Sequence, residues 1–223
     1  MDLHGKRVVV CVNGHWEHLV QTGWQRQPDD FVIAADGGYY LAKALGLELD
    51  LLIGDFDSLP AELVRELAQT VTVIRFPVAK DMTDLELAMD WALARGCREI
   101  LVLGGLGKRL DHTLGGIWLL PRWVRAGVPV MFWDPSCTVT AAEKEVVLTG
   151  QAGDILSLFP VTQLVEGIET HGLKYPLVNG RLRWGETLGV SNEFQQATVR
   201  VTWRRGILLA VHWHLERGAQ SSD

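Results

Sequence analysis

The first part of the chain alternates short apolar runs with amphipathic segments. The apolar runs predict buried strands at residues 7–12, 31–35, 49–53, 71–76, 100–103 and 128–133. Helical patterns lie between the strands at residues 39–45, 61–69, 83–95 and 113–125. Strands that alternate with helices predict an α/β domain over residues 1–140, with a mainly parallel sheet flanked by helices.

The pattern changes after Thr140, where the helical periodicity stops. Short β-rich segments separated by glycines follow at residues 145–148, 155–159, 197–203 and 207–213. This texture is typical of a small antiparallel structure, so we predict an all-β sandwich or roll domain over residues 141–217. We expect residues 218–223 to be a disordered tail.

Composition narrows the class of protein. Hydrophobic residues make up 48% of the 223 residues, which is enough to give two small domains a core. The net charge of −6 argues against general binding of nucleic acid, which needs a basic surface. Every apolar run is far shorter than the ~20 residues of a membrane span, so we expect no membrane partner.

The three cysteines, Cys11, Cys97 and Cys137, are far apart and form no C-x-x-C pair. Their number is odd, which does not suit a disulfide framework. The pattern favours reduced, buried thiols and therefore a cytoplasmic protein.

Polar residues and glycines follow five predicted strands at the point where each strand ends. Ligands of open α/β sheets bind at these carboxyl ends. The five segments are residues 13–14 (NG), 36–38 (DGG), 54–58 (GDFDS), 80–84 (KDMTD) and 104–112 (GGLGKRLDH). Together they predict one site at this edge of the sheet.

Asp55 and Asp57 are alternate residues just past a strand, so their carboxylates can point to the same side. A hard divalent cation such as Mg²⁺ would relieve their repulsion. The alternative is a solvated turn in which Ser58, two residues before Pro60, caps the next helix. The spacing alone leaves both interpretations open.

Helix capping is also an alternative for two further aspartates. Asp84 lies in a T-x-x-E capping box at residues 83–86, where the helix dipole favours an acidic residue. Asp111 is a candidate N-cap of the helix that follows it.

The glycine-rich loop that carries Lys108 and Arg109 offers N–H groups and cations for phosphate. It is not a Walker A motif, and no G-x-G-x-x-G follows the first strand. The sequence therefore favours neither a P-loop kinase nor a dehydrogenase.

His212 and His214 alternate on the predicted last strand and share a face. Two histidines without a third ligand are usually structural, and we interpret this pair in that way.

Six segments taken together resemble the thiamine pyrophosphokinase (thiamine diphosphokinase) family. They occur in the family's order and span nearly the whole chain. The segments are residues 35–38 (ADGG), 53–58 (IGDFDS), 80–86 (KDMTDLE), 104–112 (GGLGKRLDH), 172–177 (GLKYPL) and 191–193 (SNE).

The resemblance implies a homodimer in which residues 1–140 bind ATP and Mg²⁺ and residues 141–217 bind thiamine. It implies transfer of a pyrophosphoryl group from ATP to the thiamine hydroxyl, which gives AMP and thiamine diphosphate. Such transfers depend mainly on positioning and on neutralising phosphate charge.

The resemblance also assigns roles to residues. Asp55, Asp57 and Asp84 would hold Mg²⁺ and the triphosphate, with Arg109 and Asp111 beside them as catalytic groups. We expect further residues at the strand exits to bind ATP, namely Asn13, Asp36, Lys80, Asp81, Lys108 and His112.

The thiamine pocket would lie at the dimer interface. Ser191 and Asn192, with Tyr175 nearby, would help to form it, and Trp184 is a second aromatic candidate. Met82 departs from the family, which often has Gln there, and its side chain lacks the amide group that could make a polar substrate contact.

Two rival functions remain at this stage. Residues 54–59 resemble the nucleophile loop of haloacid-dehalogenase-type phosphatases, with Asp55 as nucleophile and Asp57 as acid, but that loop would follow the third strand rather than the first. The other rival is a nucleotide-sensing protein without turnover. The group that accepts the hydroxyl proton also stays open among Asp57, Asp84 and Asp111.

Overall fold

The computed structural model describes residues 1–22 and 24–215. It divides into two compact units, Met1–Asp134 and Pro135–Asp223. The division falls a few residues before residue 140, and our boundary there stays a prediction. The predicted tail at 218–223 lies outside the described residues. Among those residues, no helix is long and apolar enough to cross a membrane, and Cys11, Cys97 and Cys137 are buried and unbridged, as we expected.

The first unit is built on a parallel sheet. Its strands lie in the order β6-β5-β1-β2-β3-β4. The strands are β1 (Arg7–Cys11), β2 (Phe31–Ala35), β3 (Leu51–Gly54), β4 (Thr72–Arg75), β5 (Glu99–Leu103) and β6 (Val130–Asp134). The sequence predicted all six, because strands covered on both faces read as continuous apolar runs.

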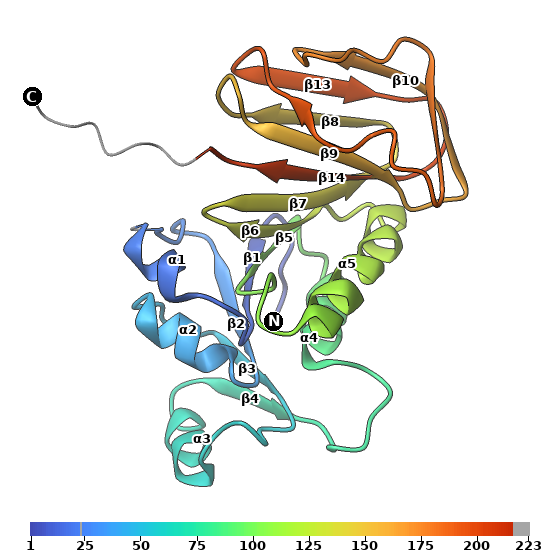
Figure 1. Ribbon diagram of the computed structural model, residues 1–223. Coiled ribbons are helices and arrows are strands. Elements are labelled where there is room, and N and C mark those ends of the chain that lie inside the picture. The colour runs from blue at the N-terminus through green and yellow to red at the C-terminus, as the bar shows by residue number, and fades with distance from the viewer. Residues whose placement is uncertain (23, 216–223) are drawn as a thin grey trace, which may run out of the picture. The chain divides into compact units, whose positions relative to one another are not determined.

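Helices cover both faces of this sheet (Figure 1). They are α1 (Glu17–Gln21), α2 (Gly38–Ala44), α3 (Ala61–Leu67), α4 (Asp84–Leu93) and α5 (Leu110–Arg125). In Figure 1, α1, α2 and α3 lie on one side of the strands, and α4 and α5 lie on the other. Four of the five were predicted. The sequence did not reveal α1, because five residues are too few for apolar positions to recur at helical spacing.

The packing explains why the strands are apolar on both sides. Val9 and Cys11 of β1 belong to one core with Leu41 of α2 and Leu19 of α1. Val10, which points to the opposite face, is also fully buried. Burial on both faces fixes the positions of the inner strands β1, β2, β3 and β5, and it thereby fixes where the loops at their ends emerge.

The second unit contains two antiparallel sheets, β12-β9-β14-β7 and β11-β10-β13-β8. Side chains of both sheets form one core, which includes Leu156 and Leu208 from the first sheet and Val165 and Val199 from the second. The strands are β7 (Cys137–Ala142), β8 (Glu145–Thr149), β9 (Ile155–Pro160), β10 (Leu164–His171), β11 (Gly180–Arg183), β12 (Asn192–Glu193), β13 (Thr198–Thr202) and β14 (Leu208–Trp213). The predicted sandwich is therefore confirmed.

Our strand list for this unit was incomplete, because it lacked β7, β10, β11 and β12. The alternation of β10 is interrupted at Gly167, which has a φ of 69° and lies where the pairing of β10 with β11 changes register. β11 and β12 are only four and two residues long. Pairing with neighbours, rather than local pattern, makes these segments strands.

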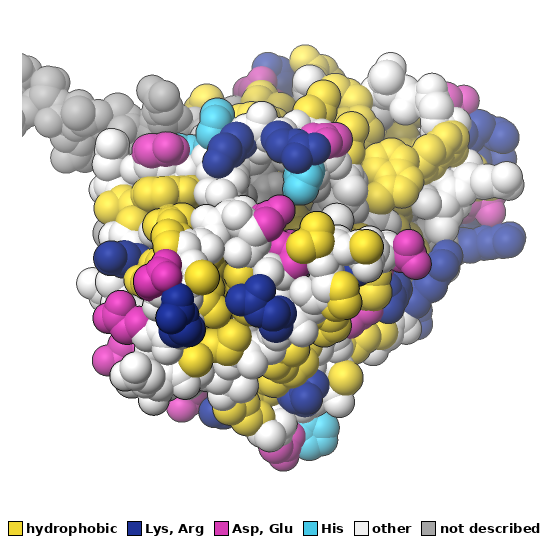
Figure 2. All heavy atoms as spheres, turned by 90° about the horizontal axis from the view of Figure 1, so that it is seen from below, with side chains coloured by type: hydrophobic (Ala, Val, Ile, Leu, Met, Phe, Trp, Pro, Cys, Tyr) yellow, Lys and Arg dark blue, Asp and Glu magenta, His cyan; other side chains and the backbone are white. Residues whose placement is uncertain are grey.

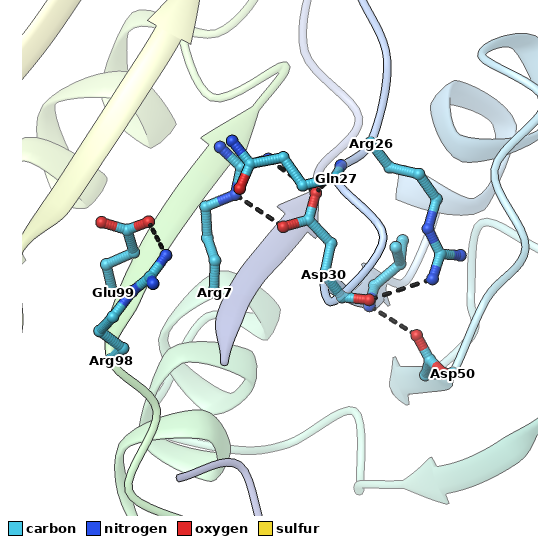
Figure 3. A network of polar contacts seen from close by, with 8 residues as sticks. Arg7, Arg26, Gln27, Asp30, Asp50, Arg98 and Glu99 are labelled. Carbon is cyan, nitrogen blue, oxygen red and sulfur yellow. Dashed lines mark hydrogen bonds and ion pairs between the residues drawn. The ribbon is translucent and has the colours of Figure 1, made fainter. Parts of the chain in front are cut away.

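An ion pair joins the amino ends of two central strands. Arg7, which begins β1, donates from Nε and Nη2 to the two carboxylate oxygens of Asp30, each at 2.7 Å (Figure 3). The backbone N–H of Gln27 also donates to Asp30, at 2.7 Å. The Asp30 side chain is 1% exposed and that of Arg7 16%. The pair is thus largely desolvated and bidentate, which is the geometry that makes an ion pair matter for stability.

We expect Asp30→Ala to lower the free energy of unfolding by about 3 kcal/mol, because it leaves a buried guanidinium without its partner. Glu62→Ala is the control. It removes the ion pair between Glu62 and Arg65, whose side chains are 80% and 74% exposed, and should change stability by less than about 0.5 kcal/mol. Urea denaturation of the three proteins measures the effect, and equal losses in both variants would contradict it.

The same pair predicts acid sensitivity. Burial raises the pKa of Asp30, but the hydrogen bonds from Arg7 and Gln27 outweigh it and hold the pKa below its ordinary value. A lowered folded pKa stabilises the protein above the unfolded pKa of about 3.9, and this contribution is lost as the pH falls through the folded pKa. The stability gap between the wild type and Asp30→Ala should therefore close in acid.

Candidate active site

A cleft of about 440 Å³ opens at the carboxyl ends of the parallel strands in the first unit. Its wall comes from the loops after β1, β2, β3, β4 and β5, as the sequence predicted. Figure 2 shows one face of the molecule, on which basic, acidic and His side chains gather around a hollow. The polar side chains of the lining are Asn13, Asp36, Asp55, Ser58, Lys80, Thr83, Asp84, Lys108, Arg109, His112 and Thr113.

The strand order explains the location. From β1 the chain adds β2, β3 and β4 on one side of the sheet, and it then adds β5 and β6 on the other side of β1. The order of the strands therefore reverses at β1 and β5. Loops diverge at such a switch point and leave a crevice. A Cβ on Gly14 would lie 1.9 Å from the Gly104 carbonyl oxygen, so the exits of β1 and β5 approach too closely for any other residue.

Three carboxylates converge in this cleft. Asp36 follows β2, Asp55 follows β3 and Asp84 begins α4. One carboxylate oxygen of each lies within 4.8 Å of the others. Asp36 is 9% exposed, and the other two are half-buried. Two of the three predicted metal ligands are thus together, and the third member of the cluster is Asp36, which we had expected to bind ATP.

The backbone holds these carboxylates in position. Asp36 has a φ of 46°, and its N–H donates to the Ile53 carbonyl oxygen at 2.8 Å, which ties the end of β2 to the end of β3. Gly54 has a φ of 149°, and a Cβ there would lie 3.1 Å from both Asp36 Cβ and Asp84 Oδ1. A side chain at position 54 would therefore push the cluster apart.

Lys80 partly balances the negative charge. Its Nζ donates to Asp55 Oδ2 at 2.5 Å and lies 3.0 Å from Asp84 Oδ1, and its side chain is only 13% exposed. The hydrogen bond from Lys80 holds the pKa of Asp55 below its ordinary value. Burial lowers the pKa of Lys80, but its bonds to Asp55 and Asp84 outweigh this and raise it.

The carboxylates still exceed the cations. Burial, with the charges of Asp55 and Asp36, raises the pKa of Asp84 despite the neighbouring Lys80. Asp36 Oδ1 is buried and has no hydrogen-bond partner among the described residues. An orphaned carboxylate oxygen beside two others suits a hard divalent cation, which prefers oxygen ligands. Asp36, Asp55 and Asp84 therefore fit a Mg²⁺ ion.

Capping explains part of the loop after β4. The N–H of Glu86 donates to Thr83 Oγ1 at 3.2 Å, so Thr83 caps α4 as predicted. Glu86 does not complete a capping box with a described contact; its carboxylate instead accepts from Arg122 Nη1 at 2.8 Å. The capping alternatives for Ser58 and Asp111 do not hold. α3 begins after Pro60 rather than Ser58, and α5 begins after Arg109, so Asp111 lies inside its first turn.

The glycine-rich loop after β5 brings basic groups to the cleft. Lys108, with a φ of 58°, donates from Nζ to the Asn13 carbonyl oxygen at 3.3 Å. Thr113 Oγ1 accepts from the Gly107 N–H at 3.1 Å and closes the loop onto α5. Arg109 forms an exposed, two-bond ion pair with Asp111. The loop thus presents two cations next to the carboxylate cluster.

Three predicted site residues of the first unit lie outside the cleft lining, and they are Asp57, Asp81 and Asp111. Asp57 is exposed and accepts a hydrogen bond from its neighbour Ser58 at 3.0 Å. Phe56, with a φ of 65°, separates Asp57 from Asp55 and is itself buried. The strand-like alternation on which the pairing of Asp55 with Asp57 rested ends at Gly54.

Sequence reasoning did not assign Ser58, Thr83 or Thr113 to the site as lining residues. Each lies within or next to a segment that we had singled out, so position relative to the strand exits was the available signal. Asp36 gave a similar signal, but a left-handed backbone at a non-glycine residue cannot be read from a sequence.

In the second unit, two predicted substrate residues are neighbours. The Tyr175 N–H donates to Asn192 Oδ1 at 3.0 Å, and Asn192 Nδ2 donates to the Tyr175 carbonyl oxygen at 2.7 Å. Ser191, with a φ of 60°, is fixed by its N–H, which donates to Ser157 Oγ at 3.0 Å. Tyr175 is 61% exposed. It is therefore a surface aromatic group rather than part of the sandwich core.

Two protein-family models match the chain. Residues 8–132 match the model described as "Thiamin pyrophosphokinase, catalytic domain". Residues 142–208 match the one described as "Thiamin pyrophosphokinase, vitamin B1 binding domain". The first match contains the whole cleft, and the second contains Tyr175, Ser191 and Asn192.

Individual proteins agree with the family models. A thiamine pyrophosphokinase of Bacillus subtilis is 30% identical over 162 residues, which are 71% of this chain and 75% of that protein. The crystal structure of thiamine pyrophosphokinase from Bacillus subtilis aligns with a TM-score of 0.82 at 26% identity, over 94% of this chain and 99% of that one. Thiamin pyrophosphokinase from Geobacillus thermodenitrificans aligns with a TM-score of 0.79 at 29% identity, over 95% and 99%.

The cluster geometry predicts which aspartates bind metal in the nucleotide-free protein. Asp36→Asn should weaken Mg²⁺ binding by roughly 100-fold, because it removes one of the converging charges. Mutation of residues that only hydrogen-bond to metal ligands already weakens metal binding on this scale. Asp57→Asn should have a much smaller effect, because Asp57 is exposed and lies outside the cluster. Isothermal titration with Mg²⁺ alone compares the two variants, and the reverse order would restore the ligand set predicted from the sequence.

Proposed function

The chain belongs to the thiamine pyrophosphokinase family, and we propose how its residues carry out the transfer of a pyrophosphoryl group from ATP to the thiamine hydroxyl. The observation that carries the proposal is the convergence of Asp36, Asp55 and Asp84 in the cleft that also receives Lys108 and Arg109. A cleft that holds both clustered carboxylates and cations suits a metal–triphosphate complex.

The carboxylates would hold Mg²⁺. Asp36, Asp55 and Asp84 are the proposed ligands in the nucleotide-free protein, and Asp57 stays a candidate once ATP is bound. When bound, Mg²⁺ neutralises phosphate charge and gathers the phosphate oxygens. Lys80 keeps Asp55 ionised, because its ammonium group stabilises the carboxylate form.

The basic loop would hold the phosphates. Lys108 and Arg109 are placed to pair with phosphate oxygens, and the backbone of the loop at residues 104–107 leaves room for a close approach. The ion pair of Arg109 with Asp111 is exposed, so it is weak in water and can open when phosphate competes for the guanidinium. Asn13 and His112 line the same cleft.

The thiamine hydroxyl would attack the β-phosphorus of ATP in line, and AMP would leave with the electron pair of the broken bond. The proton of the hydroxyl must pass to a base. Of the three carboxylates considered for this role, Asp84 lines the cleft, whereas Asp57 and Asp111 do not. Asp84 is therefore the acceptor that we favour among the three.

Thiamine would be bound by the second unit. Tyr175 offers an exposed ring to a molecule that carries a cationic thiazolium and a flat pyrimidine, so stacking and cation–π attraction are available. The two hydrogen bonds between the Tyr175 backbone and the Asn192 side chain hold the backbone that carries this ring. By family resemblance, we extend the proposal to a cytoplasmic homodimer whose thiamine pocket lies at the subunit interface.

The comparisons do not support the two rival functions. Asp55 follows β3, whereas the nucleophile loop of the phosphatase class would follow the first strand.

The identity of the leaving nucleotide tests the reaction. Incubation with ATP, Mg²⁺ and thiamine should give AMP and thiamine diphosphate in equal amounts, because attack at the β-phosphorus releases AMP. Nucleotide chromatography measures both products, and omission of Mg²⁺ is the control. Stoichiometric ADP with thiamine monophosphate would show attack at the γ-phosphorus and refute the proposal.

The aromatic contact can be tested separately. Tyr175→Ala should raise the KM for thiamine roughly tenfold and leave the KM for ATP nearly unchanged, because a ring contact of about 1–1.5 kcal/mol is lost. Val178→Ala is a control on the same loop, since Val178 is 78% exposed and lacks a ring. A thiamine KM that is equal in both variants would remove Tyr175 from the pocket.

A further inference from the structure

A second group of metal-ligand side chains lies in the second unit, far along the chain from the cleft residues. Asp154 precedes β9, His212 belongs to β14 and His214 follows β14. One ligand atom of each lies within 4.8 Å of the others. The sequence offered only the two histidines, and tertiary structure supplies a carboxylate 58 residues away as the third group.

We propose that Asp154, His212 and His214 form a binding site for a divalent transition-metal ion of the zinc class. Two imidazole nitrogens and one carboxylate oxygen are a donor set that suits Zn²⁺, and a His₂-carboxylate set leaves a fourth position for water. In a tetrahedral site with bonds of ~2.0 Å, ligand atoms are about 3.3 Å apart, so only small movements separate the described positions from coordination.

The ligands are already oriented by other groups. Asp154 Oδ1 accepts from the Leu215 N–H at 2.9 Å, and Asp154 Oδ2 accepts from the Gln151 N–H at 3.1 Å. His214 Nε2 lies 2.8 Å from Thr138 Oγ1. Such outer contacts fix ring orientation and tautomer in metal sites.

Packing also limits the movement of His212. Its ring stacks on Phe194 at 4.5 Å with an interplanar angle of 9°, and it lies 4.2 Å from the ring of His214. The side chains of His212 and Asp154 are 3% and 2% exposed.

A glycine leaves room beside the ligands. A Cβ on Gly150 would lie 2.4 Å from Asp154 Oδ2 and 2.9 Å from His212 Nε2. Without a metal, His212 Nε2 and Asp154 Oδ2 are hydrogen-bonded at 2.9 Å. A metal bound to His212 Nε2 would displace the proton at that nitrogen. From a neutral ring the proton would move to Nδ1, and from an imidazolium it would pass to solvent. The metal and the proton therefore compete for one position.

Metal binding at this position would be structural. His212 pairs with Thr138 of β7 on one side and with Leu156 of β9 on the other. A metal bound by Asp154, His212 and His214 would thus join the end of β14 to the start of β9, and it should stabilise the second unit as any ligand of the folded state does.

Zinc titration of the chelator-treated full chain, without an affinity tag, tests the proposal. Excess Mg²⁺ is present to occupy the carboxylate cluster of the first unit, and a chromophoric chelator competes for Zn²⁺. The wild type should bind one Zn²⁺ per chain, and His214→Ala should weaken binding at least about 100-fold. His214 is half-buried, so this variant should fold, which circular dichroism checks.

His171→Ala is the matched control, because His171 is an exposed histidine on β10 of the same unit. It should bind Zn²⁺ as the wild type does, and so should Asp36→Asn. Co²⁺ in place of Zn²⁺ should give the visible absorption of four-coordinate cobalt in the wild type but not in His214→Ala. Absence of micromolar Zn²⁺ binding by the wild type, or equal affinity in the wild type and His214→Ala, would overturn the proposal.

Discussion

The convergence of three carboxylates at the strand ends is the constraint on which the rest of the first unit depends. Asp36, Asp55 and Asp84 repel one another, and a half-buried environment strengthens that repulsion because water screens it poorly. One ammonium group, that of Lys80, lies among them. The fold therefore keeps a site with surplus negative charge, which is the state that a divalent cation and a triphosphate can complete.

Holding like charges together requires a rigid frame. The parallel sheet provides it, because strands buried on both faces cannot shift their register without exposing apolar side chains. Glycines at positions 14, 54 and 104 allow the loops to approach one another closely. At the opposite ends of the strands, the bidentate pair of Arg7 and Asp30 joins β1 to the segment before β2. The stabilising ion pair and the active-site residues thus lie at opposite ends of the strands.

The second unit follows a different rule. Its apolar residues form the interior of a sandwich, and its polar groups either lie on the surface or pair inside. Tyr175 and Asn192 bond to each other at the surface, where a substrate can reach them. Asp154 and His212 are buried and bond to each other, which compensates for the loss of water and brings metal-ligand atoms together.

The sequence by itself determined the fold class, the strands of the first unit, its helices other than α1, and the edge of the sheet at which the cleft opens, because apolar periodicity and strand-end residues are local signals. It also gave the family, because six segments matched in order. Only the tertiary structure decided that Asp36 rather than Asp57 joins Asp55 and Asp84, and that Asp154 joins His212 and His214. These groupings depend on left-handed backbone angles at Asp36 and Phe56 and on pairing between distant strands. Neither leaves a periodic trace, since both arise from packing between segments that are remote in sequence.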